Sequence, residues 1–122
     1  MRGLRLFIRP LDSADQQPVT DFLQAQNASA ALPACGLLGK LLGDIVAVMA
    51  IEILPDGVRI DDLIVRADLR RKWIGRAMLR ELESFARKLD RSRLVVHDAR
   101  GAEEFFRRVG FVEEGTGWAR YL

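Results

Sequence analysis

A chain of 122 residues suits one compact domain with its own buried core, and we expect a single domain over residues 1–122. Its 49% hydrophobic and 30% charged residues exclude a disordered chain, and its one cysteine excludes an internal disulfide and suggests no metal site. The net charge of +2 argues against a general nucleic-acid binder, and no apolar run is long enough to span a membrane, so we expect a cytoplasmic protein.

The first half of the sequence predicts a strand, a helix and a meander of strands. Alternating apolar and β-branched residues between glycines indicate the strands, and the Pro-Asp-Gly triplet at 55–57 indicates a tight turn. In chain order we expect a strand at 4–11, a helix within 12–27, a connector of small residues at 28–36, two strands within 37–54 and a third strand of the meander at 58–65.

The apolar period becomes helical at Ile74 and stays so to Leu89, which predicts an amphipathic helix. A short buried strand should follow at 93–99, a short helix capped by Gly110 at 101–110, and a closing hairpin at 111–122. The alternation of strands and helices predicts an α/β domain with a mixed sheet.

The stretch between the third meander strand and the long helix concentrates positive charge at a helix start. Unpaired backbone N–H groups at a helix N-terminus attract phosphates. Arg70, Arg71, Lys72 and Arg76 could pair with a pyrophosphate, and Gly75 would let the backbone approach it closely. Spacing alone leaves a solvated basic helix start as an equal alternative.

Two motifs carry a resemblance to a known family. The stretch VRADLRRKWIGRAMLREL resembles the coenzyme A signature of the GNAT acetyltransferases, R/Q-x-x-G-x-G/A, with Arg70 in its first position and Gly75 in its last. GAEEFFRRVGF resembles the second signature of that family, and IRPLDSADQQPVTDFL is similar to its usual opening. The resemblance is firm from about residue 44 to 111 and covers most of the chain. It implies a GNAT-type mixed central sheet flanked by helices, in which two splayed parallel strands form the coenzyme A cleft.

The resemblance also implies a donor and the residues that hold it. Acetyl-CoA would be the donor substrate, with no metal required. The backbone of Leu63, Ile64 and Val65 would hold the pantetheine arm, and the loop from Arg70 to Arg76, including Trp73 and Ile74, would hold the pyrophosphate. Phe106 would line the cleft, and Arg100 or Arg107 would reach the 3′-phosphate.

Two positions depart from the family pattern. Trp73 stands where the family usually has glycine, so a bulky side chain occupies a turn built for close approach. Phe106 stands where many members carry tyrosine as the general acid for the departing thiolate. Coenzyme A binding is therefore better supported than catalysis.

Amine acetylation needs a base, and the candidates are few. Glu52, Asp61 and Asp62 lie in predicted strands, although structural or solvent-facing acids are the alternative reading of all three. Asp61 and Asp62 are adjacent, so only one of them should face the cleft. His97, the only histidine, lies at the end of the fifth predicted strand and could serve as a base, with a structural role as the alternative. Tyr121, the only tyrosine, could replace the missing acid.

The sequence therefore predicts an N-acetyltransferase that moves an acetyl group from acetyl-CoA to a primary amine of a small molecule or protein. The alternative is an acetyl-CoA-binding regulator with weak or no catalysis, because the chain also resembles the GNAT-like maturation factor of aspartate decarboxylase in pantothenate synthesis. The short connector 28–36 suggests an open acceptor site or one completed by a second copy or another protein. Nucleic acid and membrane partners are not expected.

Overall fold

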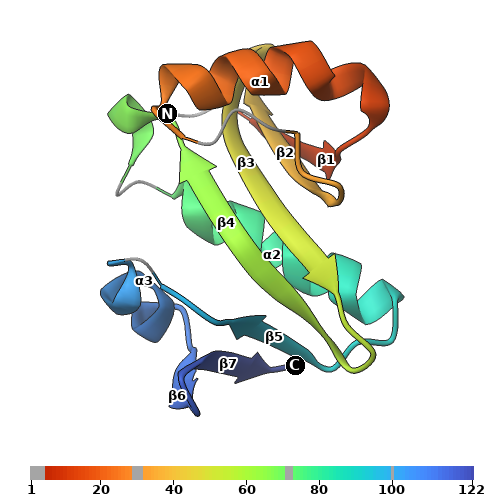
Figure 1. The fold of residues 1–122 in the computed structure, drawn as a ribbon, viewed down its shortest axis with the longest axis vertical. Coiled ribbons are helices and arrows are strands. Elements are labelled where there is room, and N and C mark those ends of the chain that lie inside the picture. Colours follow the sequence, from red (N-terminus) through yellow and green to blue (C-terminus); the bar gives the residue numbers. More distant parts are fainter. Residues whose placement is uncertain (1–4, 29–31, 71–72, 100) are drawn as a thin grey trace.

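The computed structural model describes residues 5–28, 32–70, 73–99 and 101–122, and its elements follow the predicted order (Figure 1). The helices are α1 (Gln16–Ala25), α2 (Ile74–Lys88) and α3 (Glu103–Arg108), with short 3₁₀ turns at Ser13–Asp15 and Ala67–Leu69. The strands are β1 (Leu6–Pro10), β2 (Gly36–Leu41), β3 (Asp44–Ile53), β4 (Gly57–Val65), β5 (Arg93–Val96), β6 (Val112–Glu114) and β7 (Gly117–Tyr121).

All of these strands belong to one sheet in the order β1-β2-β3-β4-β5-β7-β6. Every neighbouring pair is antiparallel except β4 and β5, which run parallel. The predicted α/β architecture with a mixed sheet is thus confirmed. β5 is shorter than expected and ends at Val96, so His97 lies in a bend beyond it.

The parallel pair separates soon after it begins. β4 and β5 are in register only at Gly57–Arg93, Val58–Leu94 and Arg59–Val95, and β4 then continues to Val65 without β5 beside it. Figure 1 shows the two strands diverging toward the start of α2 and toward α3. The predicted splay of two parallel strands is therefore present, and it opens the middle of the sheet.

A bulge lies in β4 at the point where the strands part. Ala50 pairs with Asp62 and Ile51 pairs with Ile60, so Asp61 is an extra residue without a register partner on β3. A bulge bends its strand and interrupts the strict alternation of faces. The side chains on either side of Asp61 therefore cannot be assigned to faces by counting.

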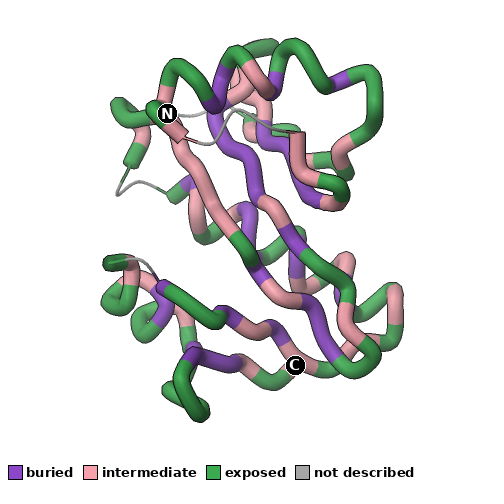
Figure 2. The backbone as a smooth tube through the Cα atoms, viewed as in Figure 1, coloured by how far each residue is buried: buried purple, intermediate pink, exposed green. Residues whose placement is uncertain are grey.

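The helices cover opposite faces of the sheet, as Figure 1 shows for α1 and α2. The α2 face buries Ile74, Met78, Leu79, Leu82 and Ala86 in the main core, which reaches strands β2 to β5 and β7 and also Phe106 and Phe111. On the other side, α1 buries Val19, Phe22 and Leu23 against Leu38 and Val48. Figure 2 shows that the buried backbone follows the central strands. No helix among the described residues is long and apolar enough to cross a membrane.

The end of α3 is fixed by a glycine turn. The Gly110 N–H donates to the Arg107 carbonyl at 3.2 Å, the Phe111 N–H donates to the Phe106 carbonyl at 2.9 Å, and Gly110 has φ +99°. This is a Schellman ending, which needs a left-handed residue and so favours glycine. The predicted cap at Gly110 is confirmed, and it fixes the position of Phe106 relative to the core.

Candidate functional site

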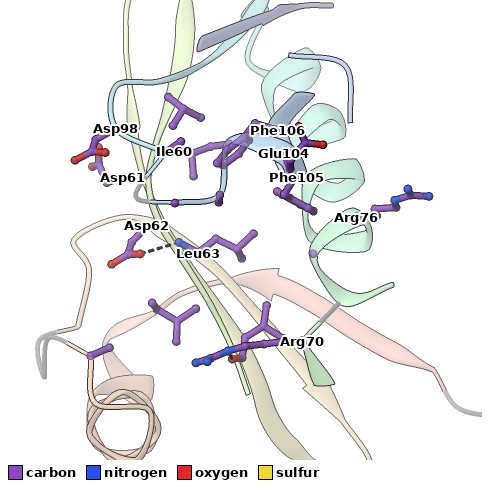
Figure 3. Close-up of a pocket in the computed structure, with 18 of the residues that line it drawn as sticks. Ile60, Asp61, Asp62, Leu63, Arg70, Arg76, Asp98, Glu104, Phe105 and Phe106 are labelled. Atoms are coloured by element: carbon purple, nitrogen blue, oxygen red, sulfur yellow. Dashed lines mark hydrogen bonds between the residues drawn. The ribbon is translucent and has the colours of Figure 1, made fainter. Parts of the chain in front are cut away.

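A cavity of about 1230 Å³ lies where β4 and β5 separate, and we call it the β4–β5 cavity (Figure 3). Its walls come from the splayed half of β4, the end of β5 and the residues after it, the starts of α2 and α3, and the end of α1. The lining on β4 runs from Ile60 to Val65. The separation of β4 from β5, which interrupts the sheet, thus creates this cavity.

Along the edge of β4 that β5 leaves unpaired, backbone groups form hydrogen bonds with side chains instead of with a strand. The Leu63 N–H donates to Asp62 Oδ1 at 3.0 Å, and the Val65 carbonyl accepts from Arg70 Nε at 3.1 Å. The predicted pantetheine-binding residues Leu63, Ile64 and Val65 all line the cavity. An extended ligand could replace these side-chain partners with its own donors and acceptors.

The start of α2 presents backbone N–H groups at the same cavity. Trp73 occupies the N-cap position, and among the described residues no side chain caps this helix and no acid lies in its first turn. Both features favour an anion at this end. Of the predicted pyrophosphate residues, Arg70, Trp73, Gly75 and Arg76 line the cavity, and Arg71 and Lys72 lie outside the described residues. The Ile74 side chain packs into the core, so only its backbone could take part.

Gly75 contacts an aromatic ring. A Cβ placed on Gly75 would lie 3.1 Å from Phe105 Cζ and 3.2 Å from Phe105 Cε1. These distances are shorter than ordinary carbon–carbon contact. The glycine that the sequence assigns to close approach by a ligand therefore also allows α3 to dock against the start of α2.

Trp73 stands at the rim of the cavity. It is 47% exposed and lines the cavity, so its indole is not packed into the core. The unusual residue of the loop is therefore compatible with access to the helix start.

The arginines are distributed differently from the prediction. Arg107 does not line the cavity; its guanidinium lies 5.3 Å from the Trp118 ring centroid and pairs with Glu104. Arg100 lies outside the described residues. Arg108, which the sequence did not single out, lines the cavity together with Glu104 and Phe105. The i,i+4 spacing of Glu104 and Arg108 on one short helix was the available signal, and it does not by itself point to a cavity.

Asp61 and Asp62 both line the cavity. The bulge at Asp61 interrupts the alternation of faces from which we expected only one of them to face the cleft, so that rule does not choose between the two residues here. Asp61 Oδ1 accepts from Arg59 Nε at 2.6 Å, and this bond raises the pKa of Arg59. Asp62 is half-buried, and Asp98, which the sequence missed, lines the cavity beyond β5.

The other three catalytic candidates do not line the cavity. Glu52 is exposed and accepts from Arg59 Nη2 at 3.0 Å. His97 is exposed in the bend after β5. Tyr121 is 60% exposed and donates to Glu114 Oε1 at 2.6 Å. Within the described parts of the chain, no three His, Cys, Asp or Glu side chains group closely enough to hold a metal ion.

Phe106 forms part of the cavity wall and is only 6% exposed. Its ring packs edge-on against Phe105, with centroids 5.3 Å apart, and against Phe111, with centroids 5.2 Å apart. These contacts hold the ring in one place. The side chain offers an apolar surface and no proton.

Comparison with known proteins gives a consistent result. A family model described as an acetyltransferase (GNAT) domain matches residues 15–118. No curated protein matches the chain in sequence.

Similar solved structures include a GNAT-family acetyltransferase from Staphylococcus aureus Mu50, with a TM-score of 0.80 at 12% identity over 97% of this chain and 99% of that one. Another is the ribosomal-protein-alanine N-acetyltransferase from Brucella melitensis biovar Abortus 2308, with a TM-score of 0.79 at 19% identity over 91% and 95%. The PaiA N-acetyltransferase from Thermoplasma acidophilum, in complex with coenzyme A, has a TM-score of 0.75 at 12% identity over 97% and 99%. At these identities the likeness concerns the fold.

Proposed function

The chain belongs to the GNAT acetyltransferase family, and from this premise we propose that it transfers an acetyl group from acetyl-CoA to a primary amine. One observation carries the proposal: the β4–β5 cavity joins the part of β4 that β5 leaves unpaired to the start of α2, which has arginines beside it and no side-chain cap among the described residues. The Thermoplasma PaiA structure holds coenzyme A on a similar fold. A strand edge suits the amides of pantetheine, and a helix start suits its diphosphate.

In this arrangement the pantetheine arm would extend along Leu63 to Val65 and exchange hydrogen bonds with their backbone. The diphosphate would accept from the first N–H groups of α2. Arg70 would assist, because its Nε is held by the Val65 carbonyl and its two terminal nitrogens are left for a phosphate. The thioester would then reach the part of the cavity that Phe106 lines.

The chemistry requires an uncharged amine and a place for its proton. Asp62 is the candidate base, because it is half-buried in the cavity wall, whereas Asp61 is exposed. The amine nitrogen would form a bond to the acetyl carbon while the carbon–sulfur bond breaks, and Asp62 would take the proton that the amine loses. Phe106 carries no proton for the departing thiolate, so water would supply it.

Acetyl-CoA should raise the melting temperature of the protein by mass action. Arg70→Ala should weaken coenzyme A binding by about 1.5–3 kcal/mol, the range for a hydrogen bond to a charged group. Lys88→Ala is the matched control, since Lys88 is an exposed cation at the opposite end of α2. Isothermal titration calorimetry measures the coenzyme A affinity of both variants. No thermal shift with either acetyl-CoA or coenzyme A would end the proposal.

Phe106 supports a second candidate function, an acetyl-CoA-binding regulator with little or no transfer activity. The residue lines the cavity at the position where many family members carry the general acid, and it has no hydroxyl. A thiol-release assay over a panel of amines separates the two candidates. Turnover supports the transferase, whereas binding without turnover supports the regulator.

A further inference from the structure

The Leu63 amide lies where the proposed path of the pantetheine arm meets the candidate base. Its N–H donates to Asp62 Oδ1 at 3.0 Å, and both residues are half-buried in the lining of the β4–β5 cavity (Figure 3). We propose that Asp62 holds this N–H in the free protein and gives it up to a carbonyl of the pantetheine arm, so that binding of the donor makes Asp62 Oδ1 available to the amine. The inference rests on the proposed function, because it assumes that the cavity binds acetyl-CoA.

The register of the sheet shows where the Leu63 N–H points. The Arg66 N–H donates to the Val46 carbonyl of β3 at 2.8 Å. Along an antiparallel pair, residues that bond to the neighbouring strand alternate with residues that do not, and the pairing of β3 with β4 is regular from residue 62 to residue 65. Leu63 and Val65 therefore turn their backbone groups away from β3. β5 does not pair with β4 beyond Arg59, so these groups face the cavity.

The bond from Leu63 to Asp62 takes the place of a bond to a neighbouring strand. A buried or half-buried backbone N–H needs an acceptor, and here the adjacent side chain supplies it. An extended arm with amide groups can bond to a strand edge as another strand would, and its carbonyl is an acceptor of the same kind. One N–H makes one good hydrogen bond, so the arm and Asp62 compete for it.

This competition changes what Asp62 offers to the acceptor. A hydrogen bond from a backbone N–H stabilises the charged carboxylate and so weakens it as a base. When the arm takes the Leu63 N–H, Asp62 Oδ1 loses this stabilisation at the moment when the thioester enters the same cavity. Asp62 is therefore a stronger base with the donor bound than without it, and the amine loses its proton where an acetyl group is present.

Calorimetric titrations with two ligands test the competition. Coenzyme A has the pantetheine arm, whereas adenosine 3′,5′-bisphosphate has the nucleotide end without it. Asp62→Ala removes the acceptor, so it should bind coenzyme A about tenfold more tightly than wild type, because nothing has to be displaced from Leu63. Asp62→Asn keeps an oxygen but loses the charge, and it should gain only about threefold, since a neutral acceptor holds the N–H about half as strongly. Neither variant should change its affinity for the bisphosphate by more than about twofold.

Two NMR measurements follow the hydrogen bond directly. The Leu63 amide proton should exchange about tenfold faster in free Asp62→Ala than in free wild type, and coenzyme A should slow its exchange in both proteins. The carboxyl carbon signal of Asp62 in the wild-type protein should shift when coenzyme A binds and should stay in place when the bisphosphate binds.

The outcomes separate the inference from its premise. An unchanged coenzyme A affinity in Asp62→Ala would exclude the competition, and equal gains in the two variants, or an equal gain for the bisphosphate, would mean that only the charge matters. A Leu63 amide that exchanges at the same rate in free wild type and free Asp62→Ala, or an Asp62 carboxyl signal that coenzyme A does not shift, would also overturn the inference. All of these results leave the proposed function standing. If coenzyme A does not bind the wild-type chain, the proposed function itself fails. Melting temperatures of the variants check that each of them is folded.

Discussion

Gly75 offers a sharp test of how α3 docks on α2. Replacing it with alanine adds one methyl group at a helical position, where alanine is favoured over glycine by up to about 1 kcal/mol and by less near a helix end, about 0.5 kcal/mol. The new carbon would lie 3.1 Å and 3.2 Å from two carbons of the Phe105 ring. The favourable backbone effect and the unfavourable contact therefore oppose one another.

The contact decides the net result. Carbon atoms at the best separation are about 3.5–4.0 Å apart, so the ring must retreat by roughly 0.4 Å or more. Overpacking costs about 1–3 kcal/mol in a full core, and we expect the lower end because Phe105 is only half-buried. Gly75→Ala should then destabilise the protein by about 0.5 kcal/mol, the difference between these two contributions.

Urea unfolding of four proteins measures the energetic coupling between residues 75 and 105. The four proteins are wild type, Gly75→Ala, Phe105→Leu and the double variant. In the Phe105→Leu background the offending ring carbons are gone, so Gly75→Ala should stabilise by about 0.5 kcal/mol, a coupling of about 1 kcal/mol. Ser84→Ala, at an exposed position of the same helix, is the control and should show no coupling to Phe105→Leu. If Gly75→Ala stabilises equally in both backgrounds, the ring does not limit the approach of the two helices and the reasoning is refuted.

Three further outcomes are expected. Phe106→Tyr should raise the rate of thiol release by about tenfold or more by restoring an acid in the cavity wall, and an unchanged rate would mean that the proton already comes from elsewhere. Asp62→Asn should lower kcat/KM about a hundredfold, whereas Asp61→Asn should change it less than about threefold, and the reverse order would exclude Asp62 as the base. The Arg9 guanidinium lowers the pKa of buried Asp15 to about 2, from an ordinary 3.8, so the stability from this pair is complete above about pH 4 and is lost as the pH falls toward 2. Asp15→Asn should therefore cost at most about 2 kcal/mol at pH 7, less because Arg9 is half-exposed, and urea unfolding should show the gap to wild type narrowing below pH 4; a gap that does not change with pH would contradict this.

The order of helices and strands was predictable because each element carries its own apolar period. The α2 face from Ile74 to Ala86 has the helical repeat, and its burial follows from that repeat. The turn at Gly110 was predictable for a similar reason, since the left-handed ending of α3 depends on one residue type. Both features are determined by residues that are close together in the sequence, so they can be predicted without knowing the tertiary fold.

The arrangement of the site was less predictable because it depends on contacts between distant elements. A bulge adds one residue to β4 without altering the apolar pattern around Asp61, so the sequence gives no sign that Asp61 and Asp62 line one cavity. Arg108 lines the cavity from α3, whose Phe105 packs closely against Gly75 of α2, and such a contact between distant elements leaves no local signal. Likewise, Glu83 of α2 pairs with Arg120 on β7, a contact between elements far apart in the sequence.

The short junction between β4 and β5 also determines how the molecule should open. Three residue pairs join β5, β7 and β6 to the rest of the sheet, whereas β2 and β3 share six pairs. The segment from β5 to the C-terminus should therefore detach in partial unfolding before the remaining strands do, and its amide protons should exchange at a lower free energy than those of β3. A ligand that spans β4 and α3 would bind only the closed form. Its binding should slow amide exchange along β5 and β7, at residues that the ligand never touches.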